Sequence, residues 1–329
     1  MPDLYDVAAI GNAIVDVIAP ASDDFLEANG LTKGAMMLVD PKASAALYSR
    51  MQQAVEASGG SAANTIAGLA SFGGKGAFMG KVADDELGRT FARDMRGIGA
   101  RFENKPLVGG PATAVSMINV TPDAQRTMCT FLGASVAFTD DDVDQETVEA
   151  AKLVYLEGYL FDAEAARRAF AKAAALAHGS GRMIALTLSD SFVVERHRAG
   201  LLGFIESQVD LLFANESEVT ALFQNDSFDD AVSQLRERVT LAAVTRSEAG
   251  SVILAKGERL TVAAEPVEKV VDTTGAGDQY AAGFMFGLSH GRPLQSCGWL
   301  ASLAAAEVIS HYGPRPQVSL RDLAASKGY

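Results

Sequence analysis

The sequence has 329 residues, 48% of them hydrophobic, which suits one large α/β domain with a sizeable core. Its formal net charge of −13 excludes a protein that binds nucleic acid through a basic face. Two cysteines without a Cys/His cluster exclude a disulfide framework and a zinc site. Without a basic leader or an apolar run of ~18–20 residues, we expect a cytoplasmic protein that binds no membrane.

The first polar motif is GNAIVD, residues 11–16, at the end of a predicted strand. The spacing of Asn12 and Asp16 suits hydrogen bonds to vicinal hydroxyls, because a carboxylate accepts two donors well. On the residues alone, a turn with Asx bonding explains the motif equally well. Residues 14–18 and 36–39 are predicted strands.

A second glycine motif, SGGSAAN, occupies residues 58–64. Gly59 and Gly60 permit close approach of a substrate, and Ser61 is predicted to cap the following helix. Asn64 falls in the first turn of that helix, on the ligand side. An ordinary capped helix is the alternative.

Residues 113–120 and 127–131 read as two strands joined by a polar turn, which predicts a hairpin. Together with residues 14–18 and 36–39 they predict a small antiparallel sheet. We expect it to form a discontinuous lid from about residues 12–40 and 103–131. Met36, Met37 and Leu38 provide either an apolar lid wall or lid core. Arg126, in the hairpin turn, either reaches a phosphate or, as we expect, is solvated.

The second half of the chain alternates short apolar runs with helical stretches. The runs are residues 153–156, 183–186, 211–213 and 242–244, and the helices include 163–178 and 229–237. This rhythm predicts βαβ units around a buried, mostly parallel sheet flanked by helices. The fold class is therefore α/β, with residues 1–329 as one domain plus its lid. A further hairpin is predicted from 252–254 and 260–262.

Polar and aromatic residues follow several of these strands, where ligands bind in an open parallel sheet. Tyr159 and Phe161 offer aromatic surface for a nucleobase. Asn215 and Glu218, in NESE, suit a phosphate and magnesium site, although on the residues alone helix capping is the favoured explanation.

The most informative motif is DTTGAGD, residues 272–278, which follows a predicted strand at 267–271 and opens a helix that Gly291 closes. Gly275, Ala276 and Gly277 then lie at a helix N-terminus, where unpaired N–H groups form an anion hole. Asp278 can accept the proton of an attacking hydroxyl, a role worth ~10²–10⁴-fold in rate. It also fits as a capping carboxylate. Neither a Walker A loop nor GxGxxG is present.

DTTGAGD with Ala282, Gly283 and Phe284 resembles the C-terminal signature of the PfkB/ribokinase family of carbohydrate and nucleoside kinases. GNAIVD, SGGSAAN, NESE and TRSEAG (residues 245–250) resemble further family motifs, in the family's order. The resemblance implies a ribokinase-like three-layer fold with a β-sheet lid. It also implies an ATP-dependent phosphotransferase with an alcohol acceptor, ATP as co-substrate and Mg²⁺ as cofactor.

The resemblance also assigns roles to residues. Asp278 would be the base, and the amides from Gly275 to Gly277 the anion hole. The expected acceptor-binding residues are Asn12, Asp16, Gly59, Gly60, Ser61, Asn64, Tyr159 and Phe161. The expected ATP-binding residues are Asn215, Thr245, Gly250, Gly275 and Gly277, with Ser247 where a glycine is common. Glu218 would hold Mg²⁺ through water, and Asp272 with the Thr274 carbonyl would form a monovalent-cation site for K⁺.

The Gly-Asn opening and the aromatic segment resemble adenosine kinases. The leading hypothesis is therefore a nucleoside kinase that phosphorylates the 5′-hydroxyl of a nucleoside such as adenosine. A sugar kinase of the ribokinase or fructokinase type is the alternative, and a nucleotide-binding regulator without turnover is a third. The sequence leaves both a monomer and a homodimer open.

Overall fold

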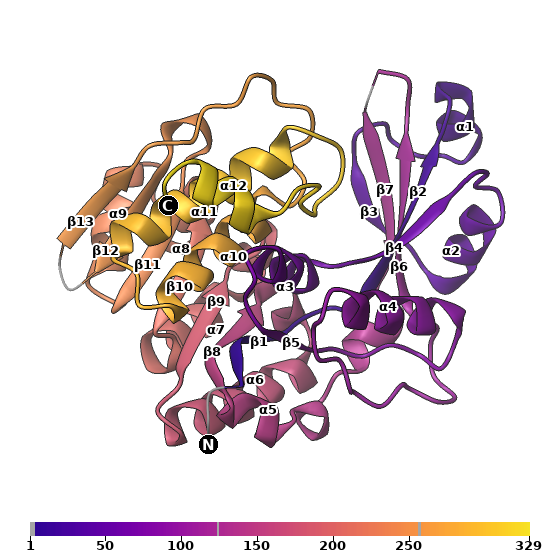
Figure 1. Ribbon diagram of the computed structural model, residues 1–329. Helices are drawn as coiled ribbons and strands as arrows, with labels where there is room; N and C mark the ends of the chain where they lie inside the picture. The colour runs from indigo at the N-terminus through magenta and orange to yellow at the C-terminus, as the bar shows by residue number, and fades with distance from the viewer. Residues whose placement is uncertain (1–3, 124, 256–257) are drawn as a thin grey trace.

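The computed structural model describes residues 4–123, 125–255 and 258–329. Among these residues, eight strands form a large sheet in the order β13-β12-β11-β10-β9-β8-β1-β5 (Figure 1). Their bounds are β1 (Tyr5–Ile10), β5 (Gly76–Met79), β8 (Ala151–Glu157), β9 (Met183–Thr187), β10 (Leu211–Asn215), β11 (Leu241–Thr245), β12 (Ser251–Ala255) and β13 (Glu258–Val262). The four apolar runs predicted in the second half are β8 to β11, so those predictions are confirmed.

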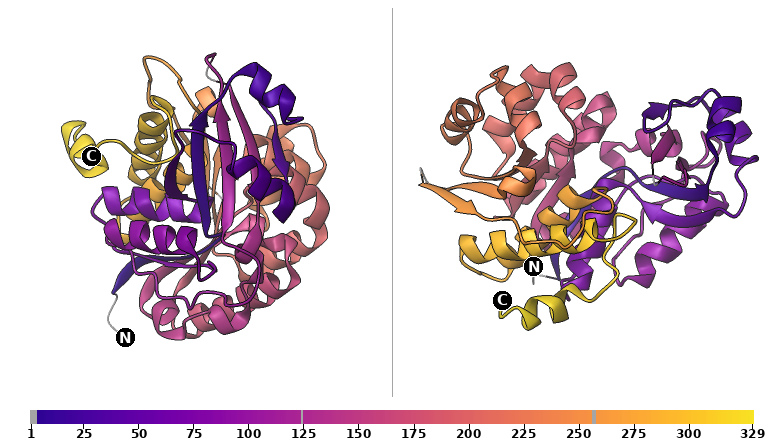
Figure 2. Two further views of the ribbon diagram at one scale, coloured as in Figure 1. Left: turned by 90° about the vertical axis from the view of Figure 1, so that its right-hand side faces the viewer. Right: turned by 90° about the horizontal axis from the view of Figure 1, so that it is seen from above.

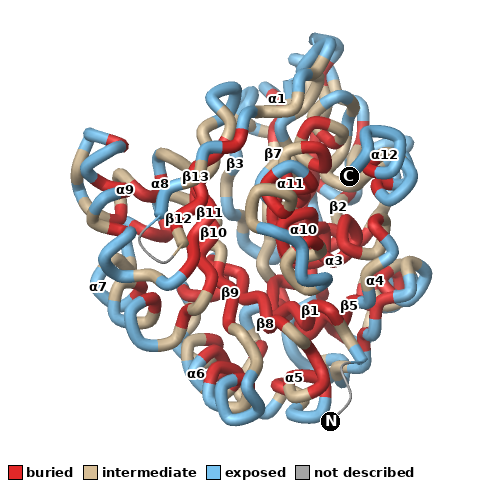
Figure 3. The backbone as a smooth tube through the Cα atoms, turned by 60° about the vertical axis from the view of Figure 1, so that its left-hand side comes forward, coloured by how far each residue is buried: buried red, intermediate tan, exposed pale blue. Residues whose placement is uncertain are grey.

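The large sheet is parallel from β5 to β11, and β12 and β13 join it antiparallel. The parallel strands are buried on both faces, which explains their continuous apolar runs (Figure 3). The β12–β13 hairpin was predicted, and its turn at Lys256 and Gly257 lies outside the described residues.

Helices cover both faces of the large sheet and make three layers. Ala8 and Ile10 face one apolar core, whereas Val7 and Ala9 face the other. The first face carries α5 (Gln145–Glu149), α6 (Glu164–Gly179), α7 (Ser191–Gln208), α8 (Glu216–Phe223) and α9 (Phe228–Arg236). The second carries α3 (Ser61–Ser71), α4 (Glu86–Gly97), α10 (Ala276–Ser289) and α11 (Leu294–Ile309), with α12 (Leu320–Ser326) packed against α11 and α3.

A second sheet forms the lid, beside the large sheet (Figure 2). Its order is β3-β7-β6-β2-β4, with β2 (Ile14–Pro20), β3 (Met36–Leu38), β4 (Val55–Gly59), β6 (Ala114–Val120) and β7 (Arg126–Phe131). The β6–β7 hairpin is confirmed. The sheet is mixed rather than antiparallel as predicted, because β2 pairs with β6, and β3 with β7, in parallel. Helices α1 (Asp23–Ala28) and α2 (Pro41–Tyr48) cover its outer face. The lid boundaries expected from the sequence omit β4, whose pattern VEASG carries too few apolar residues to signal a strand.

The strand expected at residues 267–271 is wrong, because the segment pairs with no other strand. The amides of Val271 and Asp272 instead donate to the Ile309 carbonyl at the end of α11. The segment is therefore joined to a helix end by backbone hydrogen bonds, and Val270 is 52% exposed. Within the described residues, no helix has the length and apolar character needed to cross a membrane.

Candidate active site

Helix α10 begins beside the carboxyl ends of the large-sheet strands, and Gly275 is its N-cap. Gly275 has φ 80, and a Cβ there would lie 2.6 Å from the Pro314 backbone, so only glycine fits. The Ala276 N–H, expected in the anion hole, instead donates to the Thr273 carbonyl at 3.2 Å. The N–H groups of Gly277 and Asp278 follow in the first turn, where no intrahelical acceptor exists. A Cβ added at Gly277 would meet nothing within 4 Å, so an anion can approach these amides.

The Asp278 carboxylate is held by the N-terminal turn of α3. Ser61 Oγ donates to Asp278 Oδ1 at 2.6 Å, and Asn64 Nδ2 donates to Oδ2 at 3.1 Å. Ser61 does not cap α3 as expected, because Gly60 holds that position and the Ser61 hydroxyl is bonded to Asp278. Burial raises the pKa of Asp278 to about 6, against the lowering effects of Ser61, Asn64 and Arg315. Near neutral pH the group is therefore largely an ionised base.

Glu157, at the end of β8, is a site residue that the sequence analysis missed. It is 1% exposed and accepts hydrogen bonds from Asn12 Nδ2 at 2.7 Å and from Ala62 N at 2.9 Å. Burial raises its pKa to about 7. The signal was an acidic residue at the carboxyl end of an apolar strand, directly before the aromatic segment. Glu157 ties the end of β1 to the start of α3.

Asn12 lies next to this junction, 3% exposed. Its Oδ1 atom is buried and has no hydrogen-bond partner in the described part of the chain. A buried acceptor without a partner is unfavourable unless a ligand supplies the donor. The geometry therefore leaves Asn12 available to a hydroxyl.

Asp16 projects from the lid strand β2 toward Asp278. An added Cβ at Gly59 would overlap Asp16 Oδ2 at 2.3 Å, so the glycine is needed for this approach. Burial raises the pKa of Asp16 to about 6, while the charges of Arg315 and Arg126 lower it and that of Asp278 raises it. No donor among the described residues bonds the Asp16 carboxylate, which remains available for hydroxyl groups of a substrate.

Asp272 and Thr274, expected to bind a monovalent cation, are paired with Arg126. Arg126 Nη2 lies 2.9 Å from Asp272 Oδ2, and its Nη1 donates to Thr274 Oγ1 at 3.3 Å. Arg126 is therefore not solvated, because its side chain is 10% exposed in this ion pair. The other Asp272 oxygen accepts from the amide and hydroxyl of Thr274. Arg126 therefore neutralises the Asp272 carboxylate, and the monovalent-cation site stays a prediction.

Two of the expected ATP-binding residues, Asn215 and Thr245, lie in register at the carboxyl ends of β10 and β11. Asn215 caps α8 and Glu218 bonds back to it, in a capping box. Burial raises the pKa of Glu218 to about 7. Within the described residues, no cluster of three His, Cys, Asp or Glu side chains surrounds a metal position. One carboxylate near phosphates fits Mg²⁺ that keeps most of its waters.

The turn after β11 closes on itself, since Arg246 N donates to Gly250 O at 2.7 Å. Ser247 has φ 49, the left-handed conformation that glycine adopts most easily. Although Ser247 replaces the glycine that is common at this position, its backbone keeps a conformation typical of glycine.

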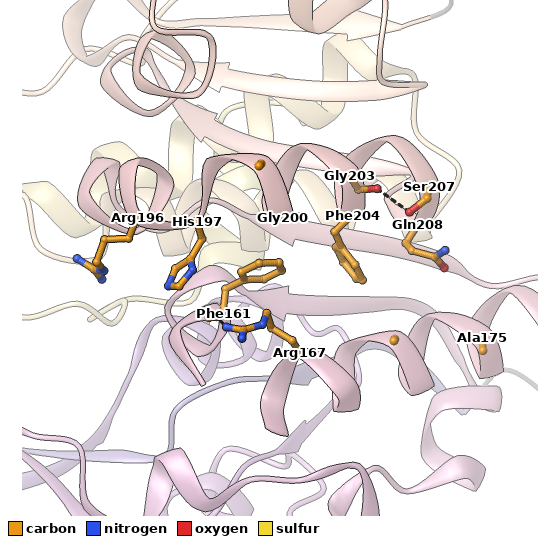
Figure 4. Close-up of a pocket in the computed structure, with 12 residues that line it drawn as sticks. Phe161, Arg167, Ala175, Arg196, His197, Gly200, Gly203, Phe204, Ser207 and Gln208 are labelled. Atoms are coloured by element: carbon orange, nitrogen blue, oxygen red, sulfur yellow. Dashed lines mark hydrogen bonds between the residues drawn. The ribbon is translucent and has the colours of Figure 1, made fainter. Parts of the chain in front are cut away.

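The aromatic segment divides between the two sides of the large sheet. Phe161 is buried against α6 and α7 and borders a groove lined by Arg167, His197 and Phe204 (Figure 4). It therefore lies on the face opposite α3 and α10, which contradicts its expected contact with the acceptor. Tyr159 stays at the carboxyl edge, where the charges of Asp190, Glu157 and Asp278 add to burial in raising its pKa.

The comparisons with known proteins agree with this geometry. Residues 6–320 match the model of the pfkB family carbohydrate kinases. The chain belongs to this family. It is therefore a phosphotransferase with an alcohol acceptor, and the family implies ATP and usually Mg²⁺.

Known relatives of this kinase include both nucleoside and sugar kinases. The structure of adenosine kinase from Sinorhizobium meliloti superposes with a TM-score of 0.91 at 52% identity, covering 98% of this chain and 99% of that one. A probable sugar kinase from Rhizobium etli CFN 42 gives 0.92 at 47% identity, covering 99% of both chains. Adenosine kinase from Saccharomyces cerevisiae is 28% identical, over 95% of this chain and 98% of that protein.

Proposed function

We propose that this kinase transfers the γ-phosphoryl group of ATP to the 5′-hydroxyl of a nucleoside such as adenosine, with Asp278 as the base. The observation that carries the nucleoside assignment is an apolar row on the lid, next to Asp16. The 52% identity to a protein described as adenosine kinase supports it.

The apolar row follows from strand register. Side chains two residues apart share a face of a sheet, so Ile18 lies on the Asp16 face of β2. Ile18 pairs with Ile118 and with Val55, Ile118 with Met128, and Met128 with Met36. Met36 and Leu38 are 53% and 63% exposed on that face, whereas Met37 packs in the lid core. A flat base can lie on this row while Asp16 binds ribose hydroxyls.

The chemical step uses groups described above. The acceptor oxygen forms a bond to the γ-phosphorus, its proton passes to Asp278, and the bond to the β–γ bridging oxygen breaks to release ADP. The N–H groups of Gly277 and Asp278 stabilise charge on the transferring group. Mg²⁺, when held near Asn215 and Glu218 through water, neutralises charge on the phosphate oxygens.

A sugar kinase is the second candidate. The free acceptor on Asn12 and the unbonded Asp16 carboxylate offer a small sugar the hydrogen bonds it needs, without any use of the apolar row. The 47% identity to a probable sugar kinase supports this alternative.

ADP release with adenosine, ribose and fructose tests the assignment. We expect kcat/KM to be highest for adenosine in the presence of ATP and Mg²⁺. A higher value for ribose or fructose would overturn the nucleoside assignment in favour of the sugar kinase.

The apolar row predicts a selective binding defect. Met36→Ser and Leu38→Ser should each raise the KM for adenosine about tenfold, because one apolar pocket contact is worth about 1–3 kcal/mol. The KM for ATP should not change. Val108→Ser, at an exposed apolar residue outside the lid sheet, serves as control. Steady-state kinetics decide the point, and unaltered adenosine KM in both variants would contradict a base-binding lid.

A further inference from the structure

Arg315 reaches the active site from the loop that follows α11. This loop is fixed to the start of α10, because Gly313 N donates to Asp272 Oδ2 at 3.0 Å and Gln279 Nε2 donates to Pro314 O at 2.9 Å. Pro314 also fills the space beside Gly275. The backbone that carries Arg315 is therefore held against the same segment that carries the base.

The Arg315 side chain determines how the Asn64 amide is oriented. Arg315 Nε donates to Asn64 Oδ1 at 3.1 Å, and the Asn64 Nδ2 atom donates to Asp278 Oδ2 at 3.1 Å. A flipped amide would set Nδ2 against the guanidinium and Oδ1 against the carboxylate, which removes both bonds. Asn64 is 5% exposed, so water does not replace them.

Arg315 also balances the negative charge of the site. Its charge acts on Asp16 from β2, Asp94 from α4 and Asp278 from α10. The other titratable groups that interact with Asp278 are Asp16, Tyr155 and Glu157 from β8, and Tyr159. Three carboxylates therefore interact with this one guanidinium.

We propose that Arg315 is a positioning residue for phosphoryl transfer, which aims the Asp278 carboxylate through the Asn64 amide and keeps that carboxylate ionised. This inference rests on the proposed role of Asp278 as base. It adds a requirement for a cation that acts on the base through the Asn64 amide.

The first test is the pH dependence of kcat in Arg315→Gln. Removal of a nearby positive charge raises the pKa of a carboxylate. The acidic limb of the kcat–pH profile should therefore move to higher pH by about one unit. At pH 8, where the base is ionised in both enzymes, kcat should still fall about tenfold because the carboxylate is misaligned. An equal loss at every pH would indicate a merely structural role and overturn the proposal.

Arg315→Lys separates charge from orientation. Lysine keeps the positive charge but lacks the Nε donor of a planar guanidinium. We expect the acidic limb of its pH profile to lie at the same pH as in the parent enzyme, while its kcat is lower. A variant indistinguishable from the parent would contradict the positioning role, and this comparison remains decisive if Arg315→Gln does not fold. Arg321→Gln, at a side chain 71% exposed, is the matched control and should leave the profile unchanged.

Asp278→Asn separates a failure of the proposed base from a failure of the proposed role of Arg315. If that variant retains turnover, the proposed base is wrong whatever Arg315 does. If it loses turnover while the acidic limb of Arg315→Gln stays in place, only the role of Arg315 is wrong.

Discussion

Asp278→Asn should lower kcat by ~10²–10⁴-fold, the range expected when a general base is removed. The asparagine fits the same hydrogen bonds, because its oxygen can accept from Asn64 and its amide can donate to the Ser61 hydroxyl. Nucleotide binding should persist, since the amides of the helix start are unchanged. Steady-state kinetics with a titration of ATP binding measure both quantities.

The same substitution should not weaken the fold. Burial raises the pKa of Asp278 from 3.8 to about 6, so the ionised carboxylate opposes folding increasingly as pH rises from about 4 through 6. The neutral amide removes that effect, and the variant at pH 8 should unfold at or above the parent temperature. Near-normal turnover in a folded Asp278→Asn protein would show that Asp278 is not the base.

Gly277→Ala should lower turnover about 10²-fold while leaving the fold intact or more stable. A Cβ at this position meets nothing within 4 Å, and alanine in a helix is favoured over glycine by roughly 0.5–1 kcal/mol. The methyl group would nevertheless stand where a phosphate must approach the N–H groups, and small misplacements of a reacting group have large effects on rate. Steady-state kinetics measure the expected loss of turnover, and calorimetric unfolding measures the expected unchanged or higher stability.

Gly203→Ala is the matched control for this variant. Gly203 is also helical, in α7, with nothing within 4 Å of an added Cβ. It lies on the opposite face of the large sheet, so it should show the stability gain without the loss of turnover. Equal activity of Gly277→Ala and Gly203→Ala would mean that the phosphate does not approach residue 277.

The lid and helix α10 both contribute charged side chains to the candidate active site. Asp16 comes from the lid and Asp278 from α10, and burial raises the pKa of both to about 6. Arg126 from the lid pairs with Asp272 beside the anion hole. If the lid moves, the electrostatics around Asp278 should change together with the access of water, which competes for a phosphoryl group.

The fold was largely predictable because its signals are local. Continuous apolar runs marked β8 to β11, and alternating strands around a polar turn marked the β6–β7 hairpin. The segments that were missed or wrongly predicted lack a distinctive hydrophobic period. Residues 267–271 are β-rich, yet the backbone there bonds to the end of α11, and β4 has almost no apolar pattern. Local propensity cannot specify which distant surface a short segment meets.

By itself, the sequence determined the alternation of strands and helices from β8 to β11 and the position of Asp278 just past a glycine-rich helix start, since both depend on neighbouring residues. The tertiary structure alone decided which side chains surround that carboxylate. Ser61 and Asn64 are more than 200 positions away from it, and Arg315 joins them from the end of the chain. Phe161 faces away although Tyr159, two residues earlier, does not. Such contacts depend on how whole layers pack, and no spacing along the chain encodes them.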